Sequence, residues 1–263
     1  MSLALRRRNE LSGSQIAELE SALAAFYKSP PPSYYPTANQ AAQHYTHAEQ
    51  PFHCDLLGHV SPGMSVLETG CGTAHLCPPI EERGGTYTGV DHSEQLLADN
   101  RRRFPQARFF AIGMLPAENF DLVASLYTIE HISDPPAYLE SLWRYCRPGG
   151  MIGIICPEFV DIAGFAPSIV FGKTPRRLRE KVLTLSLADA CQHVIDWKIR
   201  APRWKRQALA DAPGAFWINL RPRVLQADYV IDADAVYLAR QRDLGPGHAQ
   251  GAEGPARAPA IAT

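Results

Sequence analysis

The stretch VLETGCGTAHLCPP, residues 66–79, decides the fold of this 263-residue chain. An apolar run ends in an acid at Glu68, and two glycines follow at Gly70 and Gly72, ahead of a candidate helix with two early prolines. Glycine permits positive φ angles and lets the backbone approach a ligand closely. A helix N-terminus favours groups that are negative or accept hydrogen bonds. The pattern is typical of a ligand-binding turn, and its prolines require the helix to start late or to kink.

This turn departs from the dinucleotide and P-loop patterns. GxGxxG would need a third glycine where the chain has His75, and a P-loop needs a lysine followed by Ser or Thr. A carboxylate at Glu68 would repel a pyrophosphate and attract a ligand that carries an ammonium group. Asp91, nineteen residues beyond Gly72, ends the next expected strand and can accept both hydroxyls of a ribose. S-adenosylmethionine fits these demands, since it has a sulfonium, an ammonium and an adenosine but no phosphate.

Short apolar runs alternate with helical patterns along the middle of the chain. The expected strands are 64–68, 86–91, 108–112, 120–126 and 151–157. Ser93 is the expected N-cap of a helix over 93–104, and Asp134 that of a helix over 134–146. Near-continuous apolar strands with helices between them indicate an α/β fold with a parallel sheet covered on both faces.

The flanking segments predict how the chain is organised. We expect a helical N-terminal lid segment over 1–59, a domain over 60–243, a helical lid insertion within it over 158–214, and a disordered tail over 244–263. In the first segment, an amphipathic helix over 12–26 has Ser14 as its expected N-cap. Two late strands are expected at 216–220 and 234–240. Ligands bind at the C-terminal edge of open α/β sheets, so the two helical segments are the candidate lids.

The composition excludes several classes of protein. A formal net charge of −1 gives no overall sign of nucleic-acid or membrane binding, and an apolar fraction of 46% can fill a sizeable core. The six cysteines form no CxxC pair, which predicts buried, inert thiols in a reducing compartment. We see no signal peptide, and no apolar run approaches the ~20 residues of a membrane span. The expected location is cytoplasmic.

Four motifs follow one another at ordinary spacing over roughly residues 60–160. They are VLETGCGTAH, GVDHSEQLL, LPAENFDLVASLYTIEHISDP and RYCRPGGMIGIICPE. In this order the chain resembles the class I S-adenosylmethionine-dependent methyltransferases. The resemblance implies S-adenosyl-L-methionine as cofactor. It also implies a Rossmann-like, seven-stranded, mostly parallel sheet with helices on both faces and an antiparallel last strand, which the late pair of strands would complete.

The resemblance also gives roles to individual positions. Glu68, Gly70, Cys71 and Gly72 would contact the methionine end of the cofactor, and Asp91 would bind the ribose. The two faces of the adenine would lie against His92 and Leu96, and its edge against Ile112, Gly113 and Met114. The sulfonium and the acceptor would lie beside Leu126, Tyr127 and His131. Ala74 stands in the turn's third small position. The family often has an acid after the third strand, and the segment 111–114 has none, so backbone groups would recognise the adenine amino group there.

Methyl transfer needs alignment, and a general base only when the acceptor arrives protonated. His131 is the best-placed candidate for that base, with helix capping or packing as its structural alternative. Glu130 and His75 are weaker candidates, the former expected in solvent and the latter on a helix surface.

Two further groups lie in the N-terminal segment. The first group is the three histidines His44, His47 and His53, whose spacing could bind a metal ion. No carboxylate pattern accompanies them, so we expect exposed polar positions on a helix and no metal. The tyrosines of this segment could close over the sulfonium or simply pack: Tyr34, Tyr35 and Tyr45.

The acceptor is the least determined part of the prediction. Residues 173–206 carry ten basic and three acidic side chains, an excess of +7, which favours either a solvated helix face or an anionic acceptor. We expect a small-molecule O- or N-methyltransferase of a biosynthetic pathway, without membrane or nucleic-acid partners. A methyltransferase acting on RNA or protein and a non-catalytic cofactor-binding protein stay as alternatives. The oligomeric state is open, a homodimer included.

Overall fold

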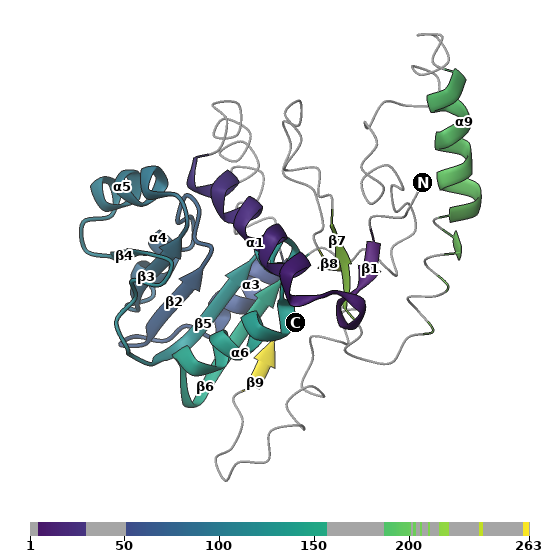
Figure 1. The fold of residues 1–263 in the computed structure, drawn as a ribbon. Helices are drawn as coiled ribbons and strands as arrows, with labels where there is room; N and C mark the ends of the chain where they lie inside the picture. Colours follow the sequence, from purple (N-terminus) through teal and green to yellow (C-terminus); the bar gives the residue numbers. More distant parts are fainter. Residues whose placement is uncertain are drawn as a thin grey trace.

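A twisted parallel sheet with helices around it forms the centre of the molecule (Figure 1). The computed structural model describes residues 5–29, 51–156 and 187–200, together with short stretches at 202–203, 206, 210, 216–220, 237–238 and 260–262.

The main sheet has six strands in the order β4-β3-β2-β5-β6-β9. In chain order they are β2 (Ser65–Thr69), β3 (Thr86–Asp91), β4 (Arg108–Ala111), β5 (Phe120–Leu126), β6 (Cys146–Ile155) and β9 (Ala260–Ala262). Every pairing between neighbours is parallel. The sequence order reverses at β2, which lies between β3 and β5. This architecture confirms the predicted Rossmann-like sheet, and such a reversal is where open α/β folds bind ligands.

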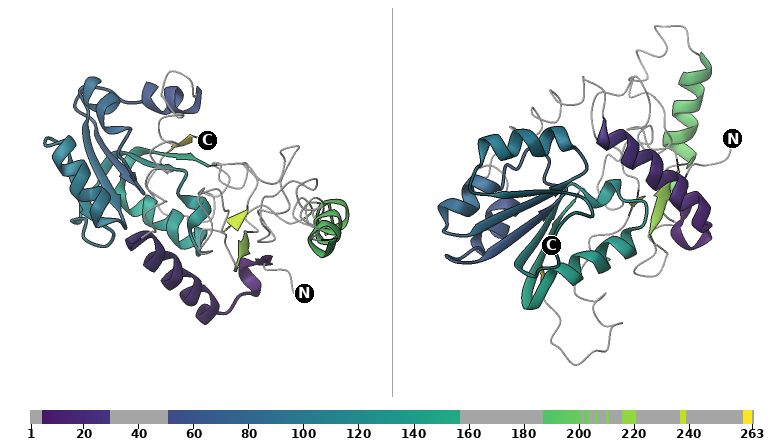
Figure 2. Two further views of the ribbon diagram at one scale, coloured as in Figure 1. Left: turned by 90° about the horizontal axis from the view of Figure 1, so that it is seen from above. Right: turned by 60° about the vertical axis from the view of Figure 1, so that its left-hand side comes forward.

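Helices cover both faces of this sheet, each over its own core (Figure 2). One core joins α3 (Pro51–Gly58), α4 (Cys77–Glu82) and α5 (Glu94–Arg103) to the sheet; the other joins α1 (Gly13–Lys28) and α6 (Pro135–Tyr145) to it. Val66 belongs to the first core and its neighbour Leu67 to the second. Successive side chains of a strand point to opposite faces, so a continuous apolar run is what a doubly covered strand requires.

The late strands do not complete the parallel sheet as predicted. β7 (Trp217–Asn219) pairs antiparallel with β8 (Tyr237–Leu238) and with the N-terminal strand β1 (Leu5–Arg7), and the three form a separate sheet. The outer edge of β6 is paired instead with β9. In the described residues the main sheet is therefore six-stranded and entirely parallel.

The N-cap of helix α1 lies two residues before the predicted one. Ser12, and not Ser14, is the N-cap: its hydroxyl accepts from the Gln15 amide, and the Gln15 side chain accepts from the Ser12 amide, which makes a capping box. Its apolar face packs into the core of the α6 side through Ile16, Leu19 and Leu23, with Phe26 partly buried against it.

A two-point ion pair joins the N-terminal arm to the parallel sheet domain. Arg8, in the short helix η1 (Arg8–Glu10), donates to both carboxylate oxygens of Asp134 at 2.6 and 3.2 Å. Asp134 is the N-cap of α6 and accepts from the Ala137 amide. The pair raises the pKa of Arg8 and lowers the pKa of Asp134, in both cases chiefly through their mutual hydrogen bond.

Little of the expected 158–214 insertion lies within the described residues. Helix α9 (Leu187–Ile195) continues into a π-helical turn, η3 (Asp196–Arg200), and stands apart from the parallel sheet in each view (Figures 1 and 2). Among the helices that the structure describes, none is both long and apolar enough to cross a membrane.

Candidate functional site

The C-terminal edge of four adjacent parallel strands brings the predicted site residues together. Asp91 at the tip of β3 pairs with Ala111 on β4, while Glu68 near the tip of β2 pairs with Gly89 on β3 and with Ala124 on β5. The segments that follow these strands carry the other predicted positions. Residues that are far apart in the sequence therefore meet at one sheet edge.

The glycine turn after β2 uses its two glycines differently. A Cβ at Gly70 would lie 2.3 Å from the Thr128 hydroxyl oxygen, and Gly70 has a φ of +74°. Thr128 follows β5, so the missing side chain at Gly70 makes room for this threonine. Gly72 has a φ of +48° and nothing within 4 Å of a Cβ position, so its backbone is the part of the turn open to a ligand.

The turn is closed by Asp91. One carboxylate oxygen of this half-buried side chain accepts from the Gly72 amide at 2.8 Å, and the other accepts from the Ser93 amide at 2.8 Å. Burial nonetheless raises the pKa of Asp91, against these hydrogen bonds. Ser93 also caps α5, as predicted, by accepting from the Leu96 amide. Asp91 thus joins the turn, its own strand and the following helix.

Glu68 is buried, with only 1% of its surface exposed. Its carboxyl accepts a short hydrogen bond from the hydroxyl of Tyr87, on β3. Burial raises the pKa of Glu68 to about 8, a shift that the bond to Tyr87 reduces and the nearby Asp91 carboxylate increases. A carboxyl with this pKa is mostly protonated at neutral pH, whereas the sequence argument treated it as a standing negative charge.

The positions that the resemblance gave to the adenine surround the tips of β3 and β4. Leu96 is buried in the first turn of α5, whereas His92 is exposed. Ile112 and Met114, after β4, are large apolar side chains with 48% and 71% of their surface exposed, and Gly113 between them has a φ of +82°. These exposed apolar side chains suit a flat heteroaromatic ring.

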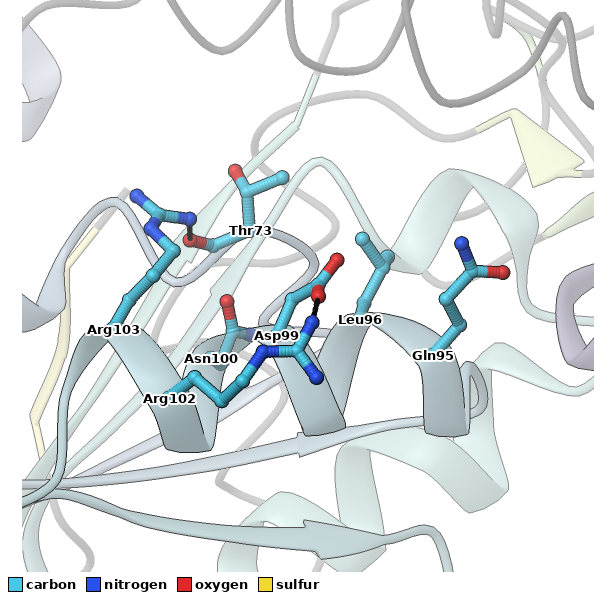
Figure 3. Close-up of a pocket in the computed structure, with 7 residues that line it drawn as sticks. All are labelled: Thr73, Gln95, Leu96, Asp99, Asn100, Arg102 and Arg103. Atoms are coloured by element: carbon cyan, nitrogen blue, oxygen red, sulfur yellow. Dashed lines mark hydrogen bonds and ion pairs between the residues drawn. The ribbon is translucent and has the colours of Figure 1, made fainter.

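A pocket of about 280 Å³ opens beside the turn, between Thr73 and α5. Figure 3 shows its lining side chains: Thr73, Gln95, Leu96, Asp99, Asn100, Arg102 and Arg103. Arg103 donates to the Thr73 carbonyl at 3.2 Å, and Arg102 pairs with Asp99. The pocket touches the predicted cofactor site through Leu96 and through Thr73, the neighbour of Gly72.

The segment after β5 places an aromatic group at the same edge. Leu126 is buried, and Tyr127 follows it with a φ of +49°, a conformation that costs a non-glycine residue energy and that clusters at functional sites. The Tyr127 ring lies 5.9 Å from the ring of His53, which in turn lies 5.8 Å from the ring of His75. His53 is fully buried, on α3, and His75 is half-buried before α4.

This histidine arrangement corrects two sequence expectations. The sequence predicts an exposed helix position for His53 and a helix-surface position for His75, yet the fold packs His53 against the rings of both His75 and Tyr127. No sequence signal could have found the pair, because residues 53, 75 and 127 meet only through tertiary structure. No group of three or more potential metal ligands occurs among the residues that the structure describes.

His131 lies farther along the same segment, in the short helix η2 (Ile129–His131). Its side chain is 11% exposed, its Nε2 lies 4.0 Å from a carboxylate oxygen of Glu130, and its ring lies 5.7 Å from that of Tyr27 on α1. Glu130 is buried and so does not point into solvent as expected. Tyr27, absent from the predicted site residues, brings helix α1 to this segment.

The cysteines follow the prediction only in part. Cys71, Cys77 and Cys146 are buried, and burial raises the pKa of each thiol, to about 12 for Cys77 and about 11 for Cys146. Cys54 and Cys191 are exposed. The side chain of Cys71 packs against Gly89, where a Cβ would lie 2.8 Å from its sulfur, so only the backbone of Cys71 faces the turn.

Several predicted features lie outside the described residues: His44, His47, Tyr34, Tyr35, Tyr45 and most of the basic stretch 173–206.

Comparisons with known proteins agree with this geometry. A family model described as a methyltransferase domain matches residues 44–208, which is more than half of the chain. A ubiquinone biosynthesis O-methyltransferase of Pseudomonas fluorescens is 31% identical over 99 residues, covering 34% of this chain and 43% of the relative. A probable S-adenosylmethionine-dependent methyltransferase of Mycolicibacterium smegmatis is 30% identical over 111 residues, covering 41% and 43%. The chain thus spans less than half the length of these curated relatives.

Solved structures include more distant matches. YjhP from E. coli has a TM-score of 0.43 at 18% identity over 68% of this chain and 86% of its own. A Geobacter sulfurreducens methyltransferase in complex with S-adenosyl-L-homocysteine has a TM-score of 0.36 at 22% identity over 46% and 54%.

Proposed function

The chain belongs to the methyltransferase-domain family, and from this premise we propose that it transfers a methyl group from S-adenosyl-L-methionine to an oxygen or nitrogen atom of a small molecule. The observation that carries the proposal is the joint placement of Glu68, the open backbone of Gly72 and Asp91 at two neighbouring strand tips. This edge offers carboxyl groups and a glycine backbone with nothing near its Cβ position, and it lacks the lysine of a phosphate-binding loop.

The residues present fit this donor. Asp91 keeps lone pairs for ribose hydroxyls beyond those used by the Gly72 and Ser93 amides. The exposed apolar side chains of Ile112 and Met114 suit the adenine. Glu68 supplies a carboxyl near the turn, where a cation would favour its ionised form. When bound, the donor supplies an activated methyl group, and the protein's task is then alignment, worth about 7–11 kcal/mol in well-oriented reactions.

For an acceptor that arrives protonated, His131 is the proposed base. Its imidazole would take the acceptor proton while Glu130, 4.0 Å away, stabilises the resulting cation. His131→Gln should lower kcat by at least about 100-fold towards phenolic acceptors and remove the histidine limb of the pH profile. His59→Gln, at an exposed histidine, is the matched control. A rate within a few-fold of the parent at every pH would assign His131 a packing role.

Two observations support the acceptor class. The matched relatives include enzymes named for O-methylation in ubiquinone biosynthesis, which favours a small molecule of a biosynthetic pathway over RNA or protein. The basic excess in 173–206 is compatible with an anionic acceptor. A macromolecular acceptor would instead need these basic side chains to form one continuous face beside the donor site.

Calorimetry with S-adenosyl-L-homocysteine tests the donor site directly. Asp91→Ala should weaken binding at least about tenfold, because hydrogen bonds to a charged group contribute about 1.5–3 kcal/mol each. Asp91→Asn retains one acceptor oxygen and should lie between the parent and Asp91→Ala. Asp55→Ala, at an exposed aspartate of α3, should bind like the parent. Equal affinity of Asp91→Ala and the parent would refute the ribose assignment, and no binding by the parent would refute the proposed function.

A further inference from the structure

Asn100 is a completely buried polar side chain in the middle of helix α5. The resemblance gave it no role. It lines the pocket beside the glycine turn, on the side of α5 that faces the loop carrying Thr73 (Figure 3). Its Nδ2 donates to the carbonyl of Gly72 at 2.8 Å. A residue that is distant in sequence thus contacts the part of the turn that is open to a ligand.

Gly72 is held from both sides. Asn100 binds its carbonyl, and the Asp91 carboxylate binds its amide at 2.8 Å. A glycine at φ +48° with nothing near its Cβ position has no side chain of its own to fix it. These two hydrogen bonds are therefore what sets the direction of the peptide groups on either side of Gly72.

The same residue carries a cost in stability. Its Oδ1 is buried, and no hydrogen-bond partner for it exists among the residues that the structure describes. A buried acceptor without a partner destabilises the folded state, and asparagine is a poor residue for a helix interior. The carboxamide orientation is fixed all the same, because rotating it by 180° would place Oδ1 against the Gly72 carbonyl oxygen.

We propose that Asn100 is a positioning residue for the methyl donor: it clamps Gly72 against α5 and thereby presents the turn and Asp91 in the geometry that the donor binds. The inference rests on the proposed function and assigns a further residue to its donor site. The clamp lowers the cost of ordering the turn when the ligand arrives, which is how preorganisation increases affinity.

The first test removes the side-chain amide of Asn100 that donates the hydrogen bond to Gly72. Asn100→Leu is similar in volume and cannot bond Gly72, so its dissociation constant for S-adenosyl-L-homocysteine should rise about tenfold in calorimetry. Exchange of the Gly72 amide proton, followed by NMR without ligand, should become at least about fivefold faster. Glu94→Gln, at an exposed position on the same helix and outside the pocket lining, is the control and should leave both quantities unchanged.

The second test distinguishes the clamp from general damage to packing. Asn100→Asp is isosteric, and full burial at this position should raise the pKa of its carboxyl well above the usual value. The protonated carboxyl at low pH can donate to the Gly72 carbonyl, whereas the carboxylate at high pH repels that oxygen. The ratio of its dissociation constant to the parent's should be at least about tenfold at pH 8.5 and fall to about twofold at pH 5.5. A packing defect would give the same ratio at both pH values, and that result would overturn the proposal.

The outcomes separate the two hypotheses. Binding by the parent with equal binding by Asn100→Leu and Asn100→Asp would overturn the role of Asn100 and leave the methyl-donor site in place. Failure of the parent itself to bind S-adenosyl-L-homocysteine would refute the proposed function, and the clamp would then have no donor to position.

Discussion

At the scale of single residues, the protonation of Glu68 sets the electrostatics of the donor site. Its carboxyl is buried against Tyr87, and burial raises its pKa to about 8. The free protein therefore avoids two adjacent buried charges at Glu68 and Asp91. A cationic ligand would favour the ionised form of Glu68, so its binding at pH 7 should release a proton.

The same pKa predicts how stability depends on pH. Because the folded pKa of Glu68, about 8, exceeds its unfolded value near 4.5, the folded state binds the proton more tightly, and this contribution to stability is lost as pH rises from 4.5 to 8. Glu68→Gln cannot ionise. Relative to the parent, the free energy of unfolding of Glu68→Gln should therefore rise across that range, by up to about 5 kcal/mol at pH 8.5.

Urea unfolding at pH 5, 6.5 and 8.5 measures this gain. Glu18→Gln, at an exposed position on α1, should show a difference from the parent that does not change with pH. A constant difference for Glu68→Gln as well would show that the carboxyl ionises normally in the folded protein.

At the scale of secondary-structure elements, the ion pair between Arg8 and Asp134 connects the N-terminal arm to α6. Both side chains are partly exposed, at 33% and 26%, so the pair is worth less than a buried one, although its two-point geometry is favourable. Arg8→Leu should lower the free energy of unfolding by about 1 kcal/mol. Asp134 still caps α6 in this variant, so the helix itself should persist.

The pH dependence of this loss has the opposite sign to that of Glu68. Arg8 lowers the pKa of Asp134, so the pair stabilises the protein above the unfolded pKa near 3.8 and loses its effect as pH falls through the folded value. The difference between parent and Arg8→Leu should be constant from pH 5 to 7 and shrink below pH 4. Glu140→Gln breaks an exposed pair with Arg144 on α6 and should cost less than about 0.5 kcal/mol. If both variants lost the same free energy of unfolding, the pair between Arg8 and Asp134 would stabilise the protein no more than an ordinary exposed ion pair.

At the scale of the whole molecule, the sequence predicted what local patterns determine. Apolar runs and caps gave the strands β3 and β5 with their observed bounds and placed α5 and α6 within about one residue. The pairing of β1 with β7 could not be predicted, because antiparallel pairing between residues 5–7 and 217–219 leaves no local signal. The pairing of β9 with β6 could not be predicted either, because it joins distant residues and because the composition of the tail that contains β9 suggested disorder.

The site shows the same division. Glu68, Gly72 and Asp91 were predictable because strand ends and glycine turns can be recognised from the local sequence. The histidine pair behind Tyr127 and the clamp by Asn100 were not, since both depend on side chains from separate elements that meet across the fold.

The close approach of Gly70 to Thr128 has a consequence for the whole catalytic edge. Gly70 belongs to the half that would receive the donor, and Thr128 to the half that would receive the acceptor. The volume that any larger residue at 70 would need is already filled by the threonine, whose hydroxyl also donates to the Leu126 carbonyl at 2.9 Å. The contact between Gly70 and the Thr128 side chain therefore fixes the spacing of these two segments, and with it the distance over which a methyl group would travel, before either reactant arrives.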